Sequence, residues 1–252
     1  MNTTKNGKDK GTDTACSGGP ETDEHKTIEE LTEKVAFLQK KRQIVGSITR
    51  HDVLNQLTAI VGYNELLGMM ADDPKFRAFL EKEKFALNKI RRQFQFAKDY
   101  QNIAVDPPRW QNIRNLTSRV SEDFDVRQVR ITVDTETATV RADPLFDRVF
   151  HHLFDNALRH GGTVTEIRIS LRQTGLSGLL FVENDGVSIP ADEKEKIFER
   201  GYGKGTGWGL FLAREILGVT GMTITETGEP GKGVRFEITL PPGSFRMDGE
   251  ES

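Results

Sequence analysis

A histidine and an aspartate stand side by side in the stretch SITRHDVLNQLTAIVGYNELL, residues 47–67. The apolar residues of this stretch recur at helical spacing, at Val53, Leu57, Ile60 and Leu67. On the helix that this spacing predicts, His51 lies on the polar face together with Asn55. A neutral imidazole is a competent nucleophile near pH 7 because its unperturbed pKa is about 6.5. Asp52 is placed to keep one ring nitrogen protonated and to accept a proton as the other attacks, so the pair favours nucleophilic chemistry.

A run of glycines in FERGYGKGTGWGLFL is suited to binding phosphate. Glycine occupies every second position from Gly201 to Gly209, directly before a predicted helix. It lets the backbone wrap around an anion, and the N-terminus of a helix presents unpaired N–H groups to phosphate. Lys204, within the run, either adds a positive charge near the phosphates or is a solvated loop lysine.

Two further stretches carry polar groups that suit a nucleotide and its metal ion. In HHLFDNALRHG, Asn156 and Arg159 lie on a predicted helix whose opposite face is apolar. Mg²⁺ prefers oxygen ligands such as the amide oxygen of asparagine, and it bridges nucleotide phosphates. In VENDGVSIP, Asn184 and Asp185 precede Gly186, where the backbone can approach a base closely.

In chain order, RHDVLNQL, FHHLFDNALRHG, VENDGVSIP and FERGYGKGTGWGLFL resemble the phospho-acceptor, N, D and glycine-rich boxes of two-component sensor histidine kinases. The resemblance covers residues 27–241. It implies an ATP-dependent autokinase that phosphorylates His51 and passes the phosphoryl group to an aspartate on the receiver domain of a response regulator. It also implies a homodimer that uses ATP with Mg²⁺.

The resemblance assigns roles on the phospho-acceptor helix. His51 matches the phospho-acceptor, and Asp52 matches the acid that assists it. Phosphatase-competent members carry an Asn or Thr four residues after the histidine, which is the position of Asn55. The resemblance therefore implies that this chain is also a phosphatase of its regulator, with a solvent-facing Asn55 as the alternative.

In the nucleotide site, the resemblance implies that Asn156 ligates Mg²⁺ and that Arg159 lies near the phosphates. It matches Phe198 to the aromatic residue of a mobile lid that runs from Ala191 to Lys204. The glycine-rich box contributes a last group of nucleotide-site residues: Lys204, Gly205, Gly207, Gly209 and Leu210.

This sequence departs from the family pattern at two places. His152 stands where most members have a further asparagine. Most members also read Asp-Asn-Gly-x-Gly where this chain has Asn184, Asp185, Gly186 and then Ser188. The family aspartate accepts a hydrogen bond from the adenine amino group. By position Asn184 takes this role, with Asp185 as second choice and Gly186 beside them in the nucleotide site.

The elements that position these residues divide the chain. Residues 1–25 contain almost no large apolar groups and are predicted as a disordered tail. Residues 26–104 contain two long amphipathic helices with a break before Pro74, which predicts a helical hairpin. The apolar spacing of the second helix is interrupted where Glu83 takes an apolar position. One hairpin cannot bury both apolar stripes, so two chains are expected to form a four-helix bundle.

Beyond the proline-rich break AVDPPRWQ, residues 107–242 alternate predicted helices and strands and carry the nucleotide motifs. Residues 243–252 are predicted to be a loose tail. The expected fold class is therefore α+β: a dimeric hairpin bundle followed by an α/β sandwich ATP-binding domain of the histidine kinase and gyrase type.

The composition of the chain bears on its binding partners and its location in the cell. The chain has 35 basic and 38 acidic residues and a net charge of −3, which gives no footprint for nucleic acid or a membrane surface. Its single cysteine, Cys16, allows no intrachain disulfide. No apolar run approaches the ~20 residues that a membrane span needs. The expected location is cytoplasmic, as a free protein or as the cytoplasmic portion of a longer sensor.

Two other functions fit parts of the sequence. The altered N and D boxes are compatible with a phosphotransfer or docking scaffold that has lost catalysis. The nucleotide fold is also shared with ATP-driven clamps of the gyrase and MutL type. Labelled ATP distinguishes the three: a kinase retains the label, a scaffold takes none, and a clamp hydrolyses ATP without becoming labelled.

Overall fold

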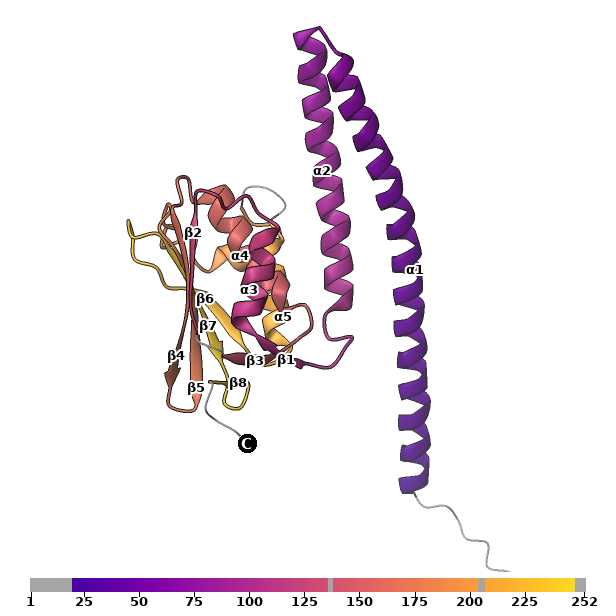
Figure 1. Cartoon of the computed structure of the whole chain (residues 1–252). Helices are drawn as coiled ribbons and strands as arrows, with labels where there is room; N and C mark the ends of the chain where they lie inside the picture. Colours follow the sequence, from indigo (N-terminus) through magenta and orange to yellow (C-terminus); the bar gives the residue numbers. More distant parts are fainter. Residues whose placement is uncertain (1–19, 136–137, 204–206, 248–252) are drawn as a thin grey trace, which may run out of the picture. The chain divides into compact units, whose positions relative to one another are not determined.

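The N-terminal part of the computed structural model is helical (Figure 1). The structure describes residues 20–135, 138–203 and 207–247; within the first helix, side chains are described at Ile28, at residues 31–37 and from Val53 onward. Helix α1 spans Pro20–Met70 and α2 spans Pro74–Asn102. Because α1 begins at Pro20, residues 20–25 are helical and do not belong to the predicted tail. The chain divides into two compact units, residues 1–49 and 50–252, and all contacts below lie within the second.

The turn between α1 and α2 forms where the sequence predicts a break. The Asp73 side chain caps α2 by accepting a hydrogen bond from the Lys75 backbone N–H at 2.8 Å, and Pro74 occupies the first turn. Buried Asn64 donates from Nδ2 to the Leu80 carbonyl and to the Glu83 carboxylate, both at 3.2 Å. This bond explains why Glu83 occupies a position of the apolar stripe.

The remaining chain forms two sheets covered by helices. The elements follow in the order β1 (Arg109–Asn112), α3 (Ile113–Glu122), β2 (Arg130–Asp134), β3 (Thr139–Ala142), α4 (Phe146–His160), β4 (Glu166–Thr174), β5 (Ser177–Asn184), the 3₁₀ helix η1 (Lys196–Phe198), α5 (Gly209–Gly218), β6 (Thr223–Glu226), β7 (Val234–Leu240) and β8 (Phe245–Arg246). The larger sheet has the strand order β2-β4-β5-β7-β6, with β2 parallel to β4 and the other pairs antiparallel. A smaller sheet has the order β1-β3-β8.

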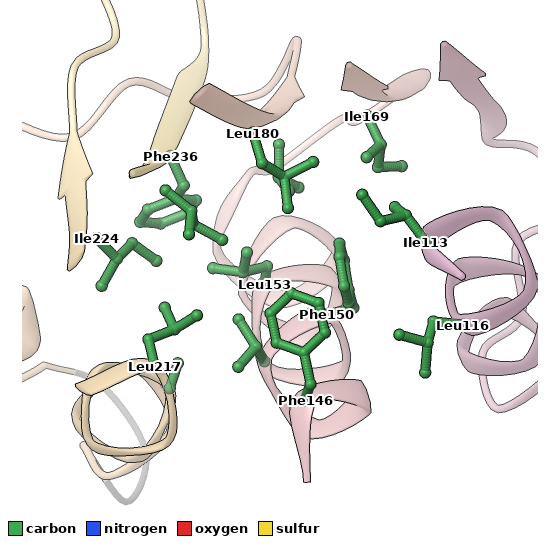
Figure 2. Packing of buried hydrophobic residues seen from close by; sticks show 14 of the residues in the cluster. Ile113, Leu116, Phe146, Phe150, Leu153, Ile169, Leu180, Leu217, Ile224 and Phe236 are labelled. Atoms are coloured by element: carbon green, nitrogen blue, oxygen red, sulfur yellow. The ribbon is translucent and has the colours of Figure 1, made fainter. Parts of the chain in front are cut away.

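The core lies between the larger sheet and its helices, as Figure 2 shows. Helix α4 points Phe146, Phe150 and Leu153 at the strands, because these residues recur every three or four positions and so share one face. Leu180 of β5 and other strand residues meet them from the sheet side. The opposite face of α4 is therefore free to carry polar chemistry.

Two short strands differ from the sequence predictions. β1 begins at Arg109, within the stretch predicted as a break, and pairs with β3. β8 lies in the predicted loose tail, where Phe245 is buried in the core and pairs with Val140. The prediction of a loose tail from residue 243 is therefore wrong for Phe245 and Arg246, because burial of one aromatic ring orders them.

Among the residues that the structure describes, no helix is both long and apolar enough to span a membrane.

Candidate active site

The polar face of α4 carries the predicted metal ligand. Asn156 is half-buried, and its amide makes no hydrogen bond to any described residue. Its neighbour Asp155 accepts a hydrogen bond from Arg159 one turn along the helix. The Arg159 guanidinium is therefore paired with Asp155 along the helix surface. Among the described residues no group of three or more His, Cys, Asp or Glu side chains could hold a metal ion.

Asp185 is committed to the fold. Its carboxylate accepts hydrogen bonds from the backbone N–H groups of Thr165 and Glu166, at 2.9 and 3.1 Å, and from the Thr165 hydroxyl. Burial acts to raise the pKa of Asp185, but these hydrogen bonds outweigh it and hold that pKa below its usual range. Asp185 thus ties the end of β5 to the start of β4, while the buried Asn184 accepts a hydrogen bond from the Gly186 N–H at 3.0 Å; which of the two reads adenine stays a prediction.

Position 186 requires glycine because its backbone lies close to the end of α4. A Cβ atom at this position would lie 2.5 Å from the Gly161 carbonyl oxygen, at the end of α4. The Val187 N–H donates to the same oxygen at 2.8 Å. In the structure the Gly186 backbone approaches the backbone of Gly161, and its predicted approach to a base stays a prediction.

The two described ends of the glycine-rich stretch meet through a hydrogen bond before α5. The Gly201 N–H donates to the Gly207 carbonyl at 2.9 Å, and Gly201, Gly203 and Gly207 all have positive φ angles, of 85°, 95° and 66°. Lys204 and Gly205 lie outside the described residues. Leu210, in the first turn of α5, packs against the hydrophobic core and so fixes the loop to the domain.

His152 fills the space below the start of α5. A Cβ atom on Gly209 would lie 3.0 Å from His152 Nδ1, so Gly209 allows the helix to approach the imidazole. Burial lowers the pKa of His152 to about 4, with smaller contributions from His151 and Arg148 that lower it further and from Asp155 that raises it. Its Nε2 has no hydrogen-bond partner in the described structure. Sequence reasoning identifies His152 only as a departure from the family pattern.

The predicted lid is anchored at its start. Phe198 is only 2 % exposed, and its ring lies 6.2 Å from that of Phe236 in the core. Lys194 forms a 2.7 Å ion pair with the buried Glu226 carboxylate and also donates to the Gly228 carbonyl. The phenyl ring of Phe198 thus packs into the core, and its role as the aromatic residue of a mobile lid stays a prediction.

The phospho-acceptor position lies on α1. His51 and Asp52 are helical, but their side chains are outside the described part of the structure. Asn55, one turn further, is exposed. The Thr58 hydroxyl donates to the Leu54 carbonyl at 2.8 Å, so this side chain is satisfied by its own helix.

Sequence reasoning missed an aromatic contact between α2 and the start of α5. The Phe96 ring lies 4.6 Å from Trp208 and 6.4 Å from Phe211, and Tyr100 stacks with Phe211 at 6.1 Å. These residues belong to apolar or aromatic positions of two separate helices, and no local pattern pairs them.

A charged contact accompanies the aromatic one. Asp99 of α2 is buried and lies 3.8 Å from Arg148 of α4. Burial raises the pKa of Asp99, although Gln95 and Arg148 act to lower it. Burial, followed by the positive charge of Arg159, lowers the pKa of Arg92, which shows that α2 brings a second arginine close to the polar face of α4.

Comparison with known proteins finds a family match for part of the chain. Residues 142–244 match the family described as histidine kinase-, DNA gyrase B- and HSP90-like ATPase. The chain is 34% identical over 119 residues to the alginate biosynthesis sensor protein KinB of Pseudomonas aeruginosa, covering 45% of this chain and 20% of that protein. It is 30% identical to the sensor kinase CckA of Brucella abortus over an alignment of 257 positions, covering 88% and 26%.

A solved structure extends the likeness to the fold. The crystal structure of full-length ShkA in complex with AMPPNP matches with a TM-score of 0.60 at 17% identity, over 79% of this chain and 46% of that one. At this identity the likeness shows the fold alone. The chain spans about a fifth to a quarter of the length of the two curated relatives. Residues 142–244 thus match the ATPase domain family of histidine kinases, gyrase B and HSP90, in a chain that is similar over most of its length to a sensor kinase.

Proposed function

We propose that this chain is an ATP-dependent histidine autokinase that phosphorylates His51 and transfers the phosphoryl group to an aspartate of a response regulator. The observation that carries the nucleotide half of this proposal is the convergence of three motifs on α4. The turn at Gly186 packs against Gly161 at the end of α4, and Gly209 packs on His152 of the same helix. Asn156 lies on α4 between His152 and Gly161. Three stretches that are far apart in the chain thus border one polar helix face.

Each group has a task in binding the nucleotide. The N–H groups at the start of α5 and the glycine-rich backbone before it bind phosphate oxygens. Asn156 offers its amide oxygen to Mg²⁺, whose charge neutralises the phosphate oxygens when bound. The unpaired amide of Asn156 fits this role because no described residue competes for it. Arg159 and Arg92 supply positive charge near the same face.

The transfer step forms a bond between a ring nitrogen of His51 and the γ-phosphorus. The bond from that phosphorus to the β–γ bridging oxygen breaks, and ADP leaves with the electron pair. The attack gives the imidazole ring a positive charge. Asp52 accepts the proton from the other ring nitrogen, so that the phosphorylated ring becomes neutral again. A second transfer then moves the phosphoryl group from His51 to a carboxylate oxygen of the receiver domain and restores the imidazole.

Asn55 supports a second activity at the same face. An amide one helical turn from His51 orients a water molecule against a phospho-aspartate on a docked receiver domain. Asn55 is exposed, as a partner would require. We expect Asn55→Ala to abolish hydrolysis of the phosphorylated regulator and to leave autophosphorylation intact. If the phosphorylated regulator decays equally fast with the unmodified chain and with Asn55→Ala, this role of Asn55 is rejected.

The principal test is incubation of the full chain with ATP labelled on the γ-phosphate. Label that stays on the protein, resists alkali and is lost in acid supports the kinase, and His51→Gln should abolish it without loss of ATP binding. His160→Gln, an exposed histidine at the end of α4, is the matched control and should label normally. No label indicates a scaffold, and ATP hydrolysis without label indicates an ATP-driven clamp.

A further inference from the structure

The chain makes a strained turn where α2 leads into the two-sheet domain, the name used here for residues 109–246, from β1 to β8. Ala104 stands in this turn with a φ of 58°, and among the described residues it is the only one other than glycine with a positive φ. In this left-handed conformation a Cβ atom crowds the following carbonyl oxygen. The turn therefore costs free energy that other contacts of the same segment must offset.

A buried carboxylate holds this turn in place. Asp143 is fully buried, and its Oδ2 accepts a hydrogen bond from the Ala104 N–H at 2.9 Å. Its Oδ1 accepts from the Leu145 N–H, also at 2.9 Å, directly before α4. Hydrogen bonds to an ionised carboxylate are stronger than those between neutral groups. Asp143 thus ties the strained turn to the start of the helix that carries Asn156.

The contacts of α2 with the two-sheet domain are partly favourable and partly costly. Phe96 packs on Trp208, and Ile103 packs against the hydrophobic core. Asp99, in contrast, is only 4% exposed, and its ion pair with Arg148 spans 3.8 Å, which is too long for a hydrogen bond. Burial raises the pKa of Asp99, so this contact disfavours its charged form. The apolar contacts are therefore partly cancelled, and the free energy that holds α2 on the domain is small.

The turn is placed where a change of conformation would have a large effect. Trp208 directly precedes α5 and follows the glycine-rich stretch, so α2 contacts the segment proposed to bind the phosphates. Hinges are typically a few residues at the end of an element that absorb large changes of φ and ψ. Residues 103–105, at the end of α2, have this position, and Ala104 has the strain that favours a second state.

We propose that Ala104 and Asp143 form a latch between α2 and the two-sheet domain. When the latch is closed, α2 stays packed on Trp208 and the domain is held in a resting position. When it opens, the domain is free to carry its nucleotide to His51. The rate of phosphorylation at saturating ATP then depends on the fraction of open chains. The affinity for ATP does not, because the groups of α4 and α5 that bind it are present in both states.

Two substitutions at position 104 shift the latch in opposite directions and leave Asp143 in place. Ala104→Gly removes the left-handed crowding and should close the latch, so that labelling at saturating labelled ATP slows by about five-fold. Ala104→Pro removes the N–H and fixes φ near −65°. Ile103 already has the extended backbone that proline requires of its predecessor, with φ −59° and ψ 131°. Labelling of Ala104→Pro should accelerate by about ten-fold.

Two further measurements separate the latch from a general loss of stability. The dissociation constant of ATP, measured by titration calorimetry, should be the same for the unmodified chain and both variants. Gly175→Ala is the matched control, because it places an alanine at a φ of 61° in the open turn between β4 and β5. Its labelling rate should be that of the unmodified chain.

Hydrogen exchange of the last turn of α2, measured by mass spectrometry, reports the latch without any phosphoryl transfer. Release of the helix end should make exchange faster in Ala104→Pro and slower in Ala104→Gly than in the unmodified chain. Equal exchange in the three chains would overturn the latch, and so would slower labelling of Ala104→Pro. This inference rests on the proposed function for its labelling rates alone. Absence of label on every chain, together with the expected exchange, would contradict the proposed function and support the latch.

Discussion

At the scale of single residues, the imidazole of His152 makes the site sensitive to acid. Its pKa of about 4 lies below the usual value because burial disfavours the charged form. The charged groups that face it are His151 and Arg148, which oppose its protonation, and Asp155, which favours it. In the unfolded chain the imidazole of His152 binds a proton below about pH 6.5. In the folded chain the same imidazole stays neutral until the pH falls to about 4.

We therefore expect the folded state to lose stability as the pH falls from about 6.5 to about 4, and the contribution of His152 to be constant below that range. Between pH 7.5 and pH 5.0 this residue should lower the free energy of unfolding by about 2 kcal/mol. Urea unfolding of the full chain at both pH values measures the loss. His152→Asn introduces the residue that most family members have, and the free energy of unfolding of this variant should fall less between the two pH values. An equal fall in the variant and in the unmodified chain would show that another group titrates.

Asn156 provides a second test at this scale. Replacement by Ala removes the amide oxygen proposed to ligate Mg²⁺, and α4 keeps its buried face because Asn156 is not part of the core. We expect the enhancement of ATP binding by Mg²⁺ to disappear, while binding of ATP in the presence of EDTA remains as in the unmodified chain. Calorimetric titrations with Mg²⁺ and with EDTA measure both. An unchanged Mg²⁺ dependence would remove Asn156 from the metal site.

The sequence predicts residue types at this site better than it predicts their contacts. Asn156 and Gly186 could be selected because an amide and a glycine in those motifs have few alternative uses. The hydrogen bonds that Asp185 accepts from Thr165 could not be predicted, because Thr165 precedes β4 and is far away in the chain. The burial of Phe198 could not be predicted for a similar reason, because it depends on Phe236 of β7.

At the scale of elements, the loop between β5 and α5 is anchored at its start. Lys194 bonds the buried carboxylate of Glu226, which also accepts from the backbone N–H groups of Gly228 and Arg235 at 2.9 and 3.1 Å. Because the core also holds Phe198, motion on nucleotide binding is expected to be confined to the glycine-rich part after residue 199.

We expect Lys194→Met to lower the free energy of unfolding by about 1–3 kcal/mol, because it leaves a buried carboxylate without its cation. Lys232→Met is the matched control: its ion pair with Glu229 is exposed and should contribute little. Urea unfolding at pH 7 compares the two variants. Equal effects would mean that the bond to Glu226 adds nothing to the stability of the loop anchor.

The strands that the sequence failed to predict are β8, which has two residues, and β1, which has four. The amphipathic helices α3, α4 and α5 follow from the spacing of their apolar residues. β8 contains two residues, and its formation depends on Phe245 reaching the core and on pairing with β3. Such pairing is a tertiary effect that alternation of two residues cannot reveal.

At the scale of the whole molecule, the hairpin leaves large apolar side chains uncovered. Ile60, Leu67, Phe76, Phe85 and Ile90 are all exposed in the single chain. Apolar surface of this extent on two long helices is typical of an interface, and a second hairpin would cover it in a four-helix bundle.

We expect the full chain to sediment as a dimer, at twice its mass of 28.3 kDa. The double variant Ile60→Glu, Leu67→Glu places charges in the apolar stripe and should convert the dimer to monomers. Leu176→Glu changes a leucine that is 80% exposed in the turn between β4 and β5, and should remain dimeric. A monomeric unmodified chain in sedimentation velocity would contradict the bundle.

The contact of Phe96 with Trp208 gives the protein an optical property. Indole emission shifts in wavelength and intensity when neighbouring aromatic rings withdraw and water replaces them, so separation of α2 from α5 becomes visible as fluorescence. The only other tryptophan is Trp110, whose ring stacks with the Arg246 guanidinium at 4.0 Å in the smaller sheet, away from the glycine-rich loop. With Trp110 replaced by Phe, the chain would carry one emitter, next to the segment expected to rearrange when nucleotide binds.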